Sequence, residues 1–281
     1  MKRISFLSFL MAVTYCVQAQ NNLHDALVNA YTNPTAENFY NVGKLLPFNQ
    51  KRIWLEKAAR MGHQDAIYEL AFHFRNETTL SKTGLKIPPN YAKAVEMYKK
   101  LTGSNKGEAL FQLALVYNEG GYGITRNTQT SLYYMELSVQ NGYAEACSYL
   151  GNSYFLGSDQ FNAGSWSYNM KKTRNDQLAF KYLKMGSEME TWGNTECMNM
   201  LAYCYATGRG TPKDMNKAHQ IIDRAIAKSS QYTLKHYIDS KGEFYLMQGD
   251  RVNARKMYDR CIQLDPNWGS QNTALYQGLF R

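Results

Sequence analysis

A ten-residue segment recurs four times along this chain, and no other feature of the sequence constrains the fold as strongly. The strong copies occupy residues 65–74, 108–117, 145–154 and 196–205, and a weaker copy occupies residues 37–46. Every strong copy has a Leu, then Ala or Gly, then an aromatic residue three positions after that small residue. Repetition at intervals of about 20–50 residues is typical of stacked repeat arrays rather than of one globular core.

Each copy predicts an α-helix that packs closely against another helix. The small residue at its centre lets the second helix approach: Gly43, Ala71, Ala114, Gly151, Ala202 and, in a later copy, Gly242. In three copies a glycine follows the aromatic residue by three positions, at Gly120, Gly157 and Gly208. Because glycine adopts the left-handed conformation without steric cost, each of these glycines is predicted to end its helix.

A second helix is predicted after each first helix. Its centre is Ala94, Ser131, Ala179 or Ala218, with apolar residues three and four positions later. Four residues before these centres stand Asn90, Asn127, Asn175 and Asp214, which are residue types that cap the free N–H groups of a helix start. The recurring pairs predict an all-α chain built from helix–turn–helix units.

The composition is that of a folded protein and excludes several other classes. Hydrophobic residues make up 44% of the 281 residues, too much for a disordered chain, and only six prolines interrupt it. The formal net charge is +9, yet no run of five like charges occurs. We therefore do not expect a nucleic-acid partner. The composition also excludes three classes of protein: a multispan membrane protein, a collagen and a disulfide-rich miniprotein.

Residues 1–19 have the pattern of a cleaved signal peptide. Lys2 and Arg3 precede an apolar stretch, and residues 17–19 form an acceptable cleavage site before Gln20. Lipoprotein anchoring at Cys16 is not expected, because Tyr15 rather than a small residue precedes it. The sequence predicts an exported protein, periplasmic or secreted, without a transmembrane segment.

The four cysteines of the predicted mature chain form no metal or disulfide pattern. They are Cys147, Cys197, Cys204 and Cys261. The middle two stand seven residues apart on one predicted helix, about 10.5 Å along its axis, whereas a disulfide needs Cα atoms about 4.4–6.8 Å apart. No CxxC pair and no zinc-type Cys/His spacing occurs. We expect small buried hydrophobic side chains here, with no metal and no cofactor.

Two segments resemble the Sel-one-like repeat family of tetratricopeptide-like helical repeat proteins. Residues 208–218, Gly-Arg-Gly-Thr-Pro-Lys-Asp-Met-Asn-Lys-Ala, resemble its Gly-x-Gly-x-x-x-Asp-x-x-Lys-Ala signature. Residues 54–62, Trp-Leu-Glu-Lys-Ala-Ala-Arg-Met-Gly, resemble the segment that closes the repeat. The resemblance covers about residues 36–266 and implies a right-handed α-solenoid of stacked antiparallel helix pairs. It also implies a protein or peptide ligand on the concave face.

The signal peptide and the resemblance together imply a domain organisation. We expect a signal peptide at 1–19, an N-terminal capping helix at 20–35, about five Sel-one-like units at 36–232 with the first degenerate, a tetratricopeptide-like repeat at 233–268 and a C-terminal tail or cap at 269–281. The last repeat is assigned from residues at that family's spacing: Gly242, Tyr245, Gly249, Asp250, Ala254, Tyr258 and Pro266.

The resemblance further implies which side chains face a ligand. Transferring the groove-facing positions of tetratricopeptide repeats predicts a partner-binding set: Tyr68, Phe72, Arg75, Phe111, Leu115, Asn118, Asn152, Phe155, Asn199 and Tyr203. Aromatic anchors in this set stand beside Asn amides that can hydrogen-bond an extended peptide backbone. The alternative is that the aromatic side chains belong to the core between repeats.

Acidic residues and a long loop give two further candidate features. Glu37, Asp65, Glu108, Glu145 and Glu196 share one position in the first turn of the first helices. Each carboxylate can meet the positive amino end of its helix; alternatively, together they form an acidic ladder that selects a basic ligand. The long segment 158–174 holds Trp166, Tyr168, Lys171 and Lys172, either a second binding site or a local core, and residues 76–89 form a smaller excursion.

No catalytic constellation is present in the sequence. Lys82-Thr83-Gly84 lacks the Ser-x-x-Lys and Ser-Asp-Asn partners that such a triplet needs, and the five histidines do not cluster. We therefore expect a non-enzymatic scaffold that binds a protein or peptide. The alternative is a cell-wall protein that binds or hydrolyses peptidoglycan.

Overall fold

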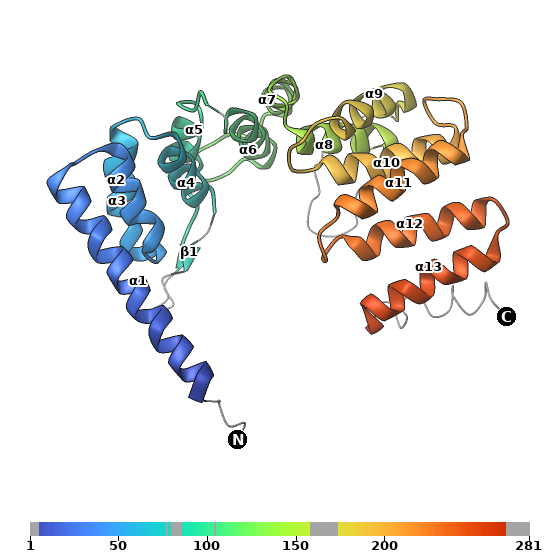
Figure 1. The fold of residues 1–281 in the computed structure, drawn as a ribbon. Coiled ribbons are helices and arrows are strands. Elements are labelled where there is room, and N and C mark those ends of the chain that lie inside the picture. Colours follow the sequence, from blue (N-terminus) through green and yellow to red (C-terminus); the bar gives the residue numbers. More distant parts are fainter. Residues whose placement is uncertain (1–5, 77, 80–85, 104, 158–173, 268–281) are drawn as a thin grey trace. The chain divides into compact units, whose positions relative to one another are not determined.

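The computed structural model describes residues 6–76, 78–79, 86–103, 105–157 and 174–267 (Figure 1). The chain divides into two compact units, Met1–Asn127 (unit 1) and Thr128–Arg281 (unit 2). Thirteen helices and one two-stranded hairpin make up the regular structure of the described residues. The prediction of an all-α chain is confirmed, apart from the hairpin.

Unit 1 contains six of these helices. They are α1 (Phe6–Thr32), α2 (Ala36–Leu45), α3 (Phe48–Arg60), α4 (Gln64–Arg75), α5 (Tyr91–Tyr98) and α6 (Lys106–Glu119). In the excursion between α4 and α5, β1 (Thr78–Thr79) pairs with β2 (Lys86–Ile87) in antiparallel register, with Thr78 opposite Ile87. The sequence analysis did not predict this hairpin, although β-branched Thr and Ile side chains favour extended backbone.

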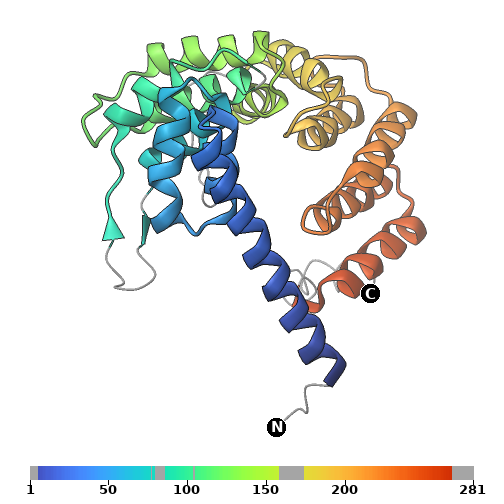
Figure 2. The same cartoon turned by 60° about the vertical axis from the view of Figure 1, so that its left-hand side comes forward.

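Unit 2 contains the other seven helices. They are α7 (Thr128–Gln140), α8 (Ala144–Leu156), α9 (Asp176–Ser187), α10 (Asn194–Thr207), α11 (Met215–Lys228), α12 (Leu234–Met247) and α13 (Arg251–Leu264). The pairs α8/α9, α10/α11 and α12/α13 each lie side by side (Figures 1 and 2). Because α10 also packs against α8 and α9, and α12 against α11, each pair shares its core with the next.

At Gly43, Gly151 and Gly242 the first helix lies against the second helix, as predicted, because a Cβ atom there would contact Leu55, Leu183 and Tyr258 respectively. Ala71 and Ala202 are fully buried. A Cβ atom at Gly151 would lie 2.6 Å from Leu183 Cδ2 of α9. A methyl group at Gly151 would therefore overlap Leu183 unless the helix pair moved apart.

Three of the predicted helix caps are confirmed. The side chains of Asn90, Asn175 and Asp214 accept hydrogen bonds from the backbone N–H three residues later, at 3.0, 3.0 and 2.9 Å. Asp250 caps α13 in the same way, at 3.0 Å. Each bond satisfies one of the N–H groups that a helix start leaves without an intrahelical partner.

The glycines after three first helices end those helices as predicted. Gly120, Gly157 and Gly208 have φ values of 69°, 73° and 74°. Their N–H groups donate to carbonyl oxygens of the last helical turn. Since residues with a Cβ atom rarely adopt such φ values, the recurring glycines in the sequence predict where these helices end.

Helix α1 runs without a break from Phe6 to Thr32 and packs against α2. Its amino-terminal half projects beyond α2 and α3 in both views (Figures 1 and 2). It includes most of the predicted signal peptide and of the predicted capping helix, so no break in the backbone marks the boundary at Gln20. Among the described residues, no helix is long and apolar enough to span a bilayer.

Each unit has its own apolar core. In unit 1, Leu55 and Ala58 of α3 pack with Leu70 of α4. In unit 2, the cluster between neighbouring pairs includes Met198 of α10 and Ile222 of α11. These side chains are almost completely buried, which accounts for the strict spacing of apolar residues in the repeats.

The four cysteines of unit 2 lie within this packed interior. All are buried, and none forms a disulfide. Burial raises the pKa of the Cys147, Cys204 and Cys261 thiols to about 12, and it raises the pKa of Cys197 well above its usual value. Protonated and buried, they pack as small hydrophobic side chains.

Candidate binding surface

The predicted ligand-facing residues of α4 combine an exposed ring with two polar side chains that reach α6. Phe72 is 42% exposed. Tyr68 donates its hydroxyl hydrogen to Glu108, and Arg75 donates to Glu119 Oε1 at 2.9 Å. Tyr68 and Arg75 therefore join two first helices of unit 1, whereas Phe72 presents its ring to solvent.

The three predicted residues of α6 lie deeper. Phe111 and Leu115 are buried in the packed interior, and so is most of Asn118. The Oδ1 atom of Asn118 is fully buried and accepts no hydrogen bond from any described residue. This helix therefore supplies one polar group with unused hydrogen-bonding capacity rather than an aromatic anchor.

In unit 2 the two predicted aromatic residues are covered to different degrees. Phe155 of α8 is buried beneath Arg209, whose Cζ lies 3.5 Å from the ring centroid. Arg209 also donates to Asp176 Oδ1 at 2.6 Å. Tyr203 of α10 is half-buried, packs edge-on against Phe244, and donates its hydroxyl hydrogen to Glu243 at 2.6 Å.

Two predicted asparagines of unit 2 also have unused acceptors. Asn199 of α10 is 8% exposed, and Asn152 of α8 is partly buried. The Oδ1 atom of each is fully buried and makes no hydrogen bond with the described residues. Leaving a buried polar group unpaired costs about 1–3 kcal/mol. Because each oxygen has almost no accessible surface, a ligand could reach it only if the surrounding side chains moved.

The five acidic residues lie in the first turns of their helices, as predicted. In unit 1 each has a neutral or ionisable donor from another helix or loop. Glu37 pairs with His63 Nε2 at 3.0 Å, and Asp65 accepts from Asn105 Nδ2 at 2.7 Å. Tyr68 likewise donates to Glu108. In unit 1, the acidic residues therefore form hydrogen bonds or ion pairs that connect one repeat to the next.

The two acidic residues of unit 2, Glu145 and Glu196, form no ion pair with the residues that the structure describes. Burial and the charge of Glu196 raise the pKa of Glu145 to about 7. Burial also raises the pKa of Glu196, an effect that hydrogen bonds from Tyr237 and Asn152 reduce. Glu145 and Glu196 therefore lie close enough to repel each other, on adjacent first helices.

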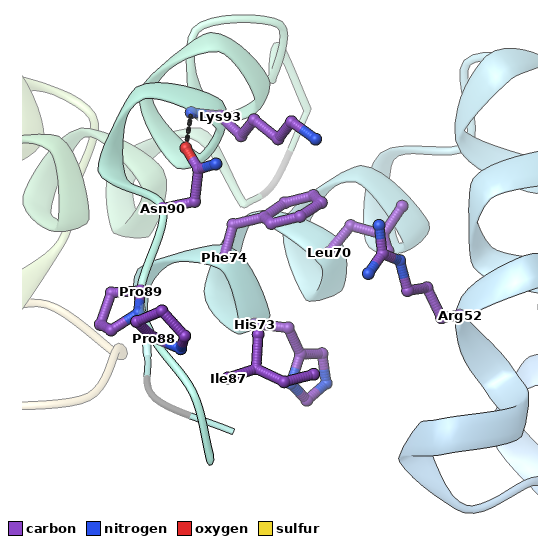
Figure 3. A pocket seen from close by; sticks show the side chains of 9 residues that line it. All are labelled: Arg52, Leu70, His73, Phe74, Ile87, Pro88, Pro89, Asn90 and Lys93. Carbon is purple, nitrogen blue, oxygen red and sulfur yellow. Dashed lines mark hydrogen bonds between the residues drawn. The ribbon is translucent and has the colours of Figure 1, made fainter. Parts of the chain in front are cut away.

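A separate pocket of about 310 Å³ lies in unit 1 between α3, α4, the hairpin and α5 (Figure 3). Its lining consists of Arg52, Leu70, His73, Phe74, Ile87, Pro88, Pro89, Asn90 and Lys93. Arg52 Cζ and Lys93 Nζ each lie 5.4 Å from the centre of the Phe74 ring. An apolar floor with two cations at its edge suits a ligand that has an apolar part and a negatively charged group.

None of these pocket residues belongs to the predicted partner-binding set. The one signal for them was the unusual length of the excursion at residues 76–89, of which Ile87, Pro88 and Pro89 form one wall of the pocket. A repeat pattern predicts what recurs in every unit, whereas this wall is an insertion found in one unit.

Two other sequence predictions fall outside the described residues. They are the loop site at Trp166, Tyr168, Lys171 and Lys172, and the triplet Lys82-Thr83-Gly84. Within the part of the chain that the structure describes, no group of three or more His, Cys, Asp or Glu side chains lies close enough to hold a metal ion.

Stacked helix pairs that share a continuous core define an α-solenoid, a class of repeat protein. The sequence profile of the Sel1 repeat matches residues 52–63, 64–101, 107–143, 144–190 and 195–230. This chain belongs to the Sel1 repeat family, and its predicted right-handed α-solenoid fold is confirmed. Proteins of this family are generally non-enzymatic scaffolds that mediate protein interactions. No curated protein sequence gives a significant match.

Two crystal structures have a similar fold. A protective antigen of uropathogenic Escherichia coli strains with an SLR fold has a TM-score of 0.64 and 19% identity, over 93% of this chain and 53% of that chain. A Sel1 repeat protein from Oxalobacter formigenes has a TM-score of 0.61 and 19% identity, over 90% of this chain and 98% of that chain. This chain thus spans about half the length of the antigen, and the likeness is one of fold.

Proposed function

We propose that this protein is an exported, non-enzymatic scaffold that binds a protein or peptide partner on the faces of its first helices. The observation that carries the proposal is the exposed ring of Phe72 on the first helix α4. Aromatic side chains of this kind are typical anchors at protein interfaces. The family's general role in protein interactions supports the same conclusion.

Phe72 is the best-placed anchor of the predicted set. Its ring is exposed on α4, and large exposed aromatic side chains contribute strongly to binding when a partner covers them. Tyr203 is the corresponding candidate in unit 2, although part of its ring already packs against Phe244. Binding should therefore depend more on Phe72 than on Tyr203.

The amino-terminal sequence supports export. A basic start, a short apolar stretch and a small residue at Ala19 fit a signal peptide. Expression of the full chain, followed by fractionation and amino-terminal sequencing, should give an envelope or secreted protein that begins at Gln20. A cytoplasmic product that retains Met1 would contradict export.

Capture of a partner tests the binding proposal. Immobilised mature protein should retain a specific protein from an envelope extract, and Phe72→Ala should weaken this retention without lowering thermal stability. Tyr133→Ala is a matched control, because Tyr133 is an exposed aromatic residue on the second helix α7. Equal losses from both variants would argue against a first-helix binding face.

The peptidoglycan alternative makes a different prediction. If the protein acts on cell wall, purified peptidoglycan should retain it in the absence of other proteins, and soluble fragments should appear if it hydrolyses the polymer. Retention that is insensitive to Phe72→Ala, combined with no protein captured from the extract, would favour this alternative.

A further inference from the structure

The aromatic residue that ends the ten-residue repeat lies against a lysine in one repeat of each unit. Lys93 Nζ is 5.4 Å from the ring centre of Phe74, and Lys217 Nζ is 5.0 Å from that of Tyr205. Each lysine stands three residues after the residue that caps the second helix. Phe74 and Tyr205 therefore occupy equivalent places in their repeats, and their surroundings can be compared directly.

Arg52 stands where the repeat in unit 2 has a phenylalanine. Leu55 of α3 and Leu183 of α9 are equivalent, because each lies against the central glycine of the first helix before it. Arg52 precedes Leu55 by three residues, and Phe180 precedes Leu183 by three residues. Arg52 and Phe180 therefore share one position on the helix that precedes α4 or α10.

These two side chains leave different surroundings for the ring beside them. Phe180 packs edge-on against Tyr205, with ring centres 5.6 Å apart, and Tyr205 is only 9% exposed. Arg52 instead pairs with Glu56 at 2.8 Å, and its Cζ lies 5.4 Å from the ring centre of Phe74. Arg52 and Phe74 both line the pocket of unit 1, so an aromatic ligand there can pack on Phe74 as a side-chain ring packs in unit 2.

The insertion between α4 and α5 gives this pocket a preformed wall (Figure 3). Ile87, Pro88 and Pro89 supply the wall, and the proline rings restrict its backbone. Ile87 pairs with β1 in the hairpin, and the N–H of Asn90 donates to the carbonyl oxygen of Phe74 at 2.6 Å. Because both ends of the wall are held in place, binding of a ligand would order little additional chain.

The pocket has one positive charge that no described residue pairs with. None of its nine lining residues is acidic. Lys93 interacts electrostatically with Glu96, but Glu96 itself pairs with Lys100 at 2.8 Å. Burial lowers the pKa of His73, so its imidazole is uncharged near pH 7. Since Arg52 already has a carboxylate partner, the lining favours a ligand with a single negative charge.

We propose that this pocket binds a small aromatic carboxylate, with its ring against Phe74 and its carboxylate beside Lys93. A cavity of about 150 Å³ holds a benzene molecule, so a pocket of about 310 Å³ accommodates a ring with a short acid chain. A carboxylate accepts charge-assisted hydrogen bonds from an ammonium group. The pocket contains none of the predicted partner-binding residues, so the inference is independent of the proposed function.

Calorimetric titration tests the inference on the mature protein. The probe is hydrocinnamate, and its control is hydrocinnamamide, which has the same ring and size but no charge. We expect the carboxylate to bind with a Kd of about 1 mM or below, as a ligand of this size allows. The amide should bind at least about fivefold more weakly, because it lacks the charge that Lys93 recognises.

A matched pair of lysine variants locates the site. Lys93→Gln should weaken the binding of hydrocinnamate about fivefold, because it removes the cation beside the carboxylate. Lys217→Gln removes the equivalent cation in unit 2, where Phe180 already covers the ring, and should change the affinity less than about twofold. Thermal melts of both variants should remain cooperative, which excludes unfolding as the cause of a loss.

Restoring the ring of the repeat should close the pocket. Arg52→Phe places a phenylalanine at the position of Phe180, so hydrocinnamate binding should fall below detection while the thermal melt remains cooperative. Absence of binding by wild type at about 10 mM ligand would overturn the inference. Equal affinities for acid and amide, equal losses from the two lysine variants, or unchanged binding by Arg52→Phe would each overturn it as well.

Discussion

The backbone N–H of Asp214 donates a hydrogen bond to the carbonyl oxygen of Tyr205 at 2.9 Å. The same bond recurs from Asn175 to Tyr154, from Asn127 to Tyr117 and from Asn90 to Phe74, at 2.9, 2.8 and 2.6 Å. In every case the donor precedes the second helix and the acceptor is the aromatic residue of the ten-residue repeat. Loops of quite different lengths therefore begin and end at one fixed contact, which allows insertions without altering the helix pair.

Removing a cap should weaken the helix pair by a defined amount. Asp214→Ala retains the backbone bond to Tyr205 but removes the side-chain bond to Lys217 N, so the free energy of unfolding should fall by about 1 kcal/mol. Chemical denaturation monitored by circular dichroism measures this change. Asn216→Ala, an exposed position in the same first turn, is the control and should have little effect. Equal effects would mean that the cap is not the cause.

A single methyl group should be harmful at Gly151. Gly→Ala inside a helix usually stabilises by about 0.5–1 kcal/mol, but here the new Cβ would lie 2.6 Å from Leu183 Cδ2. We expect Gly151→Ala to destabilise the protein by about 1–3 kcal/mol through overpacking. Ala202→Leu should cost a similar amount, because Ala202 is fully buried in the core of unit 2.

The double variant Gly151→Ala/Leu183→Ala provides the control for this prediction. Leu183→Ala alone should cost about 2–5 kcal/mol by leaving a cavity. In that background the added methyl group at Gly151 has room, so its cost should disappear or reverse. Additive losses in denaturant melts would show that Leu183 does not restrict Gly151.

Stability should depend on pH through Glu145. Its folded pKa of about 7 exceeds the usual value of 4.5, so the folded state binds this proton more tightly than the unfolded state. The resulting stabilisation is fully present below about pH 4.5 and is lost as the pH rises through 7. Glu145→Gln should therefore be more stable than wild type at pH 8 by about 1–3 kcal/mol, with a flatter pH profile. Glu190→Gln, at an exposed position, should leave the profile unchanged.

The thiols should be unreactive until the protein unfolds. Cys147, Cys197, Cys204 and Cys261 are buried, and their raised pKa values leave almost no thiolate at pH 8. Ellman's reagent should therefore label none of them quickly in the native mature protein and all four in guanidinium chloride. Labelling of only two thiols after denaturation would reveal a disulfide that this structure lacks.

The helix pairs could be predicted because their determinants are local in the sequence. A small residue, a following aromatic residue and a glycine occur within a few turns of one helix, and a capping side chain acts three residues from itself. The conformations of Gly208 and Asp214 follow from their own covalent structure and nearest neighbours. Such features recur in several units, so their repetition along the chain was sufficient to establish an all-α repeat fold.

Burial and pairing at the binding surface were decided only by the tertiary structure. Phe72 and Phe155 were both predicted to face a ligand. Arg209, from a loop after α10, covers the ring of Phe155, whereas the ring of Phe72 is 42% exposed. Glu108 and Glu145 share one repeat position, yet Tyr68 donates to the first, while the second faces Glu196. Local sequence determines which helix face a side chain occupies; its charge state and exposure depend on residues about 40 or more positions away, which packing alone brings into contact.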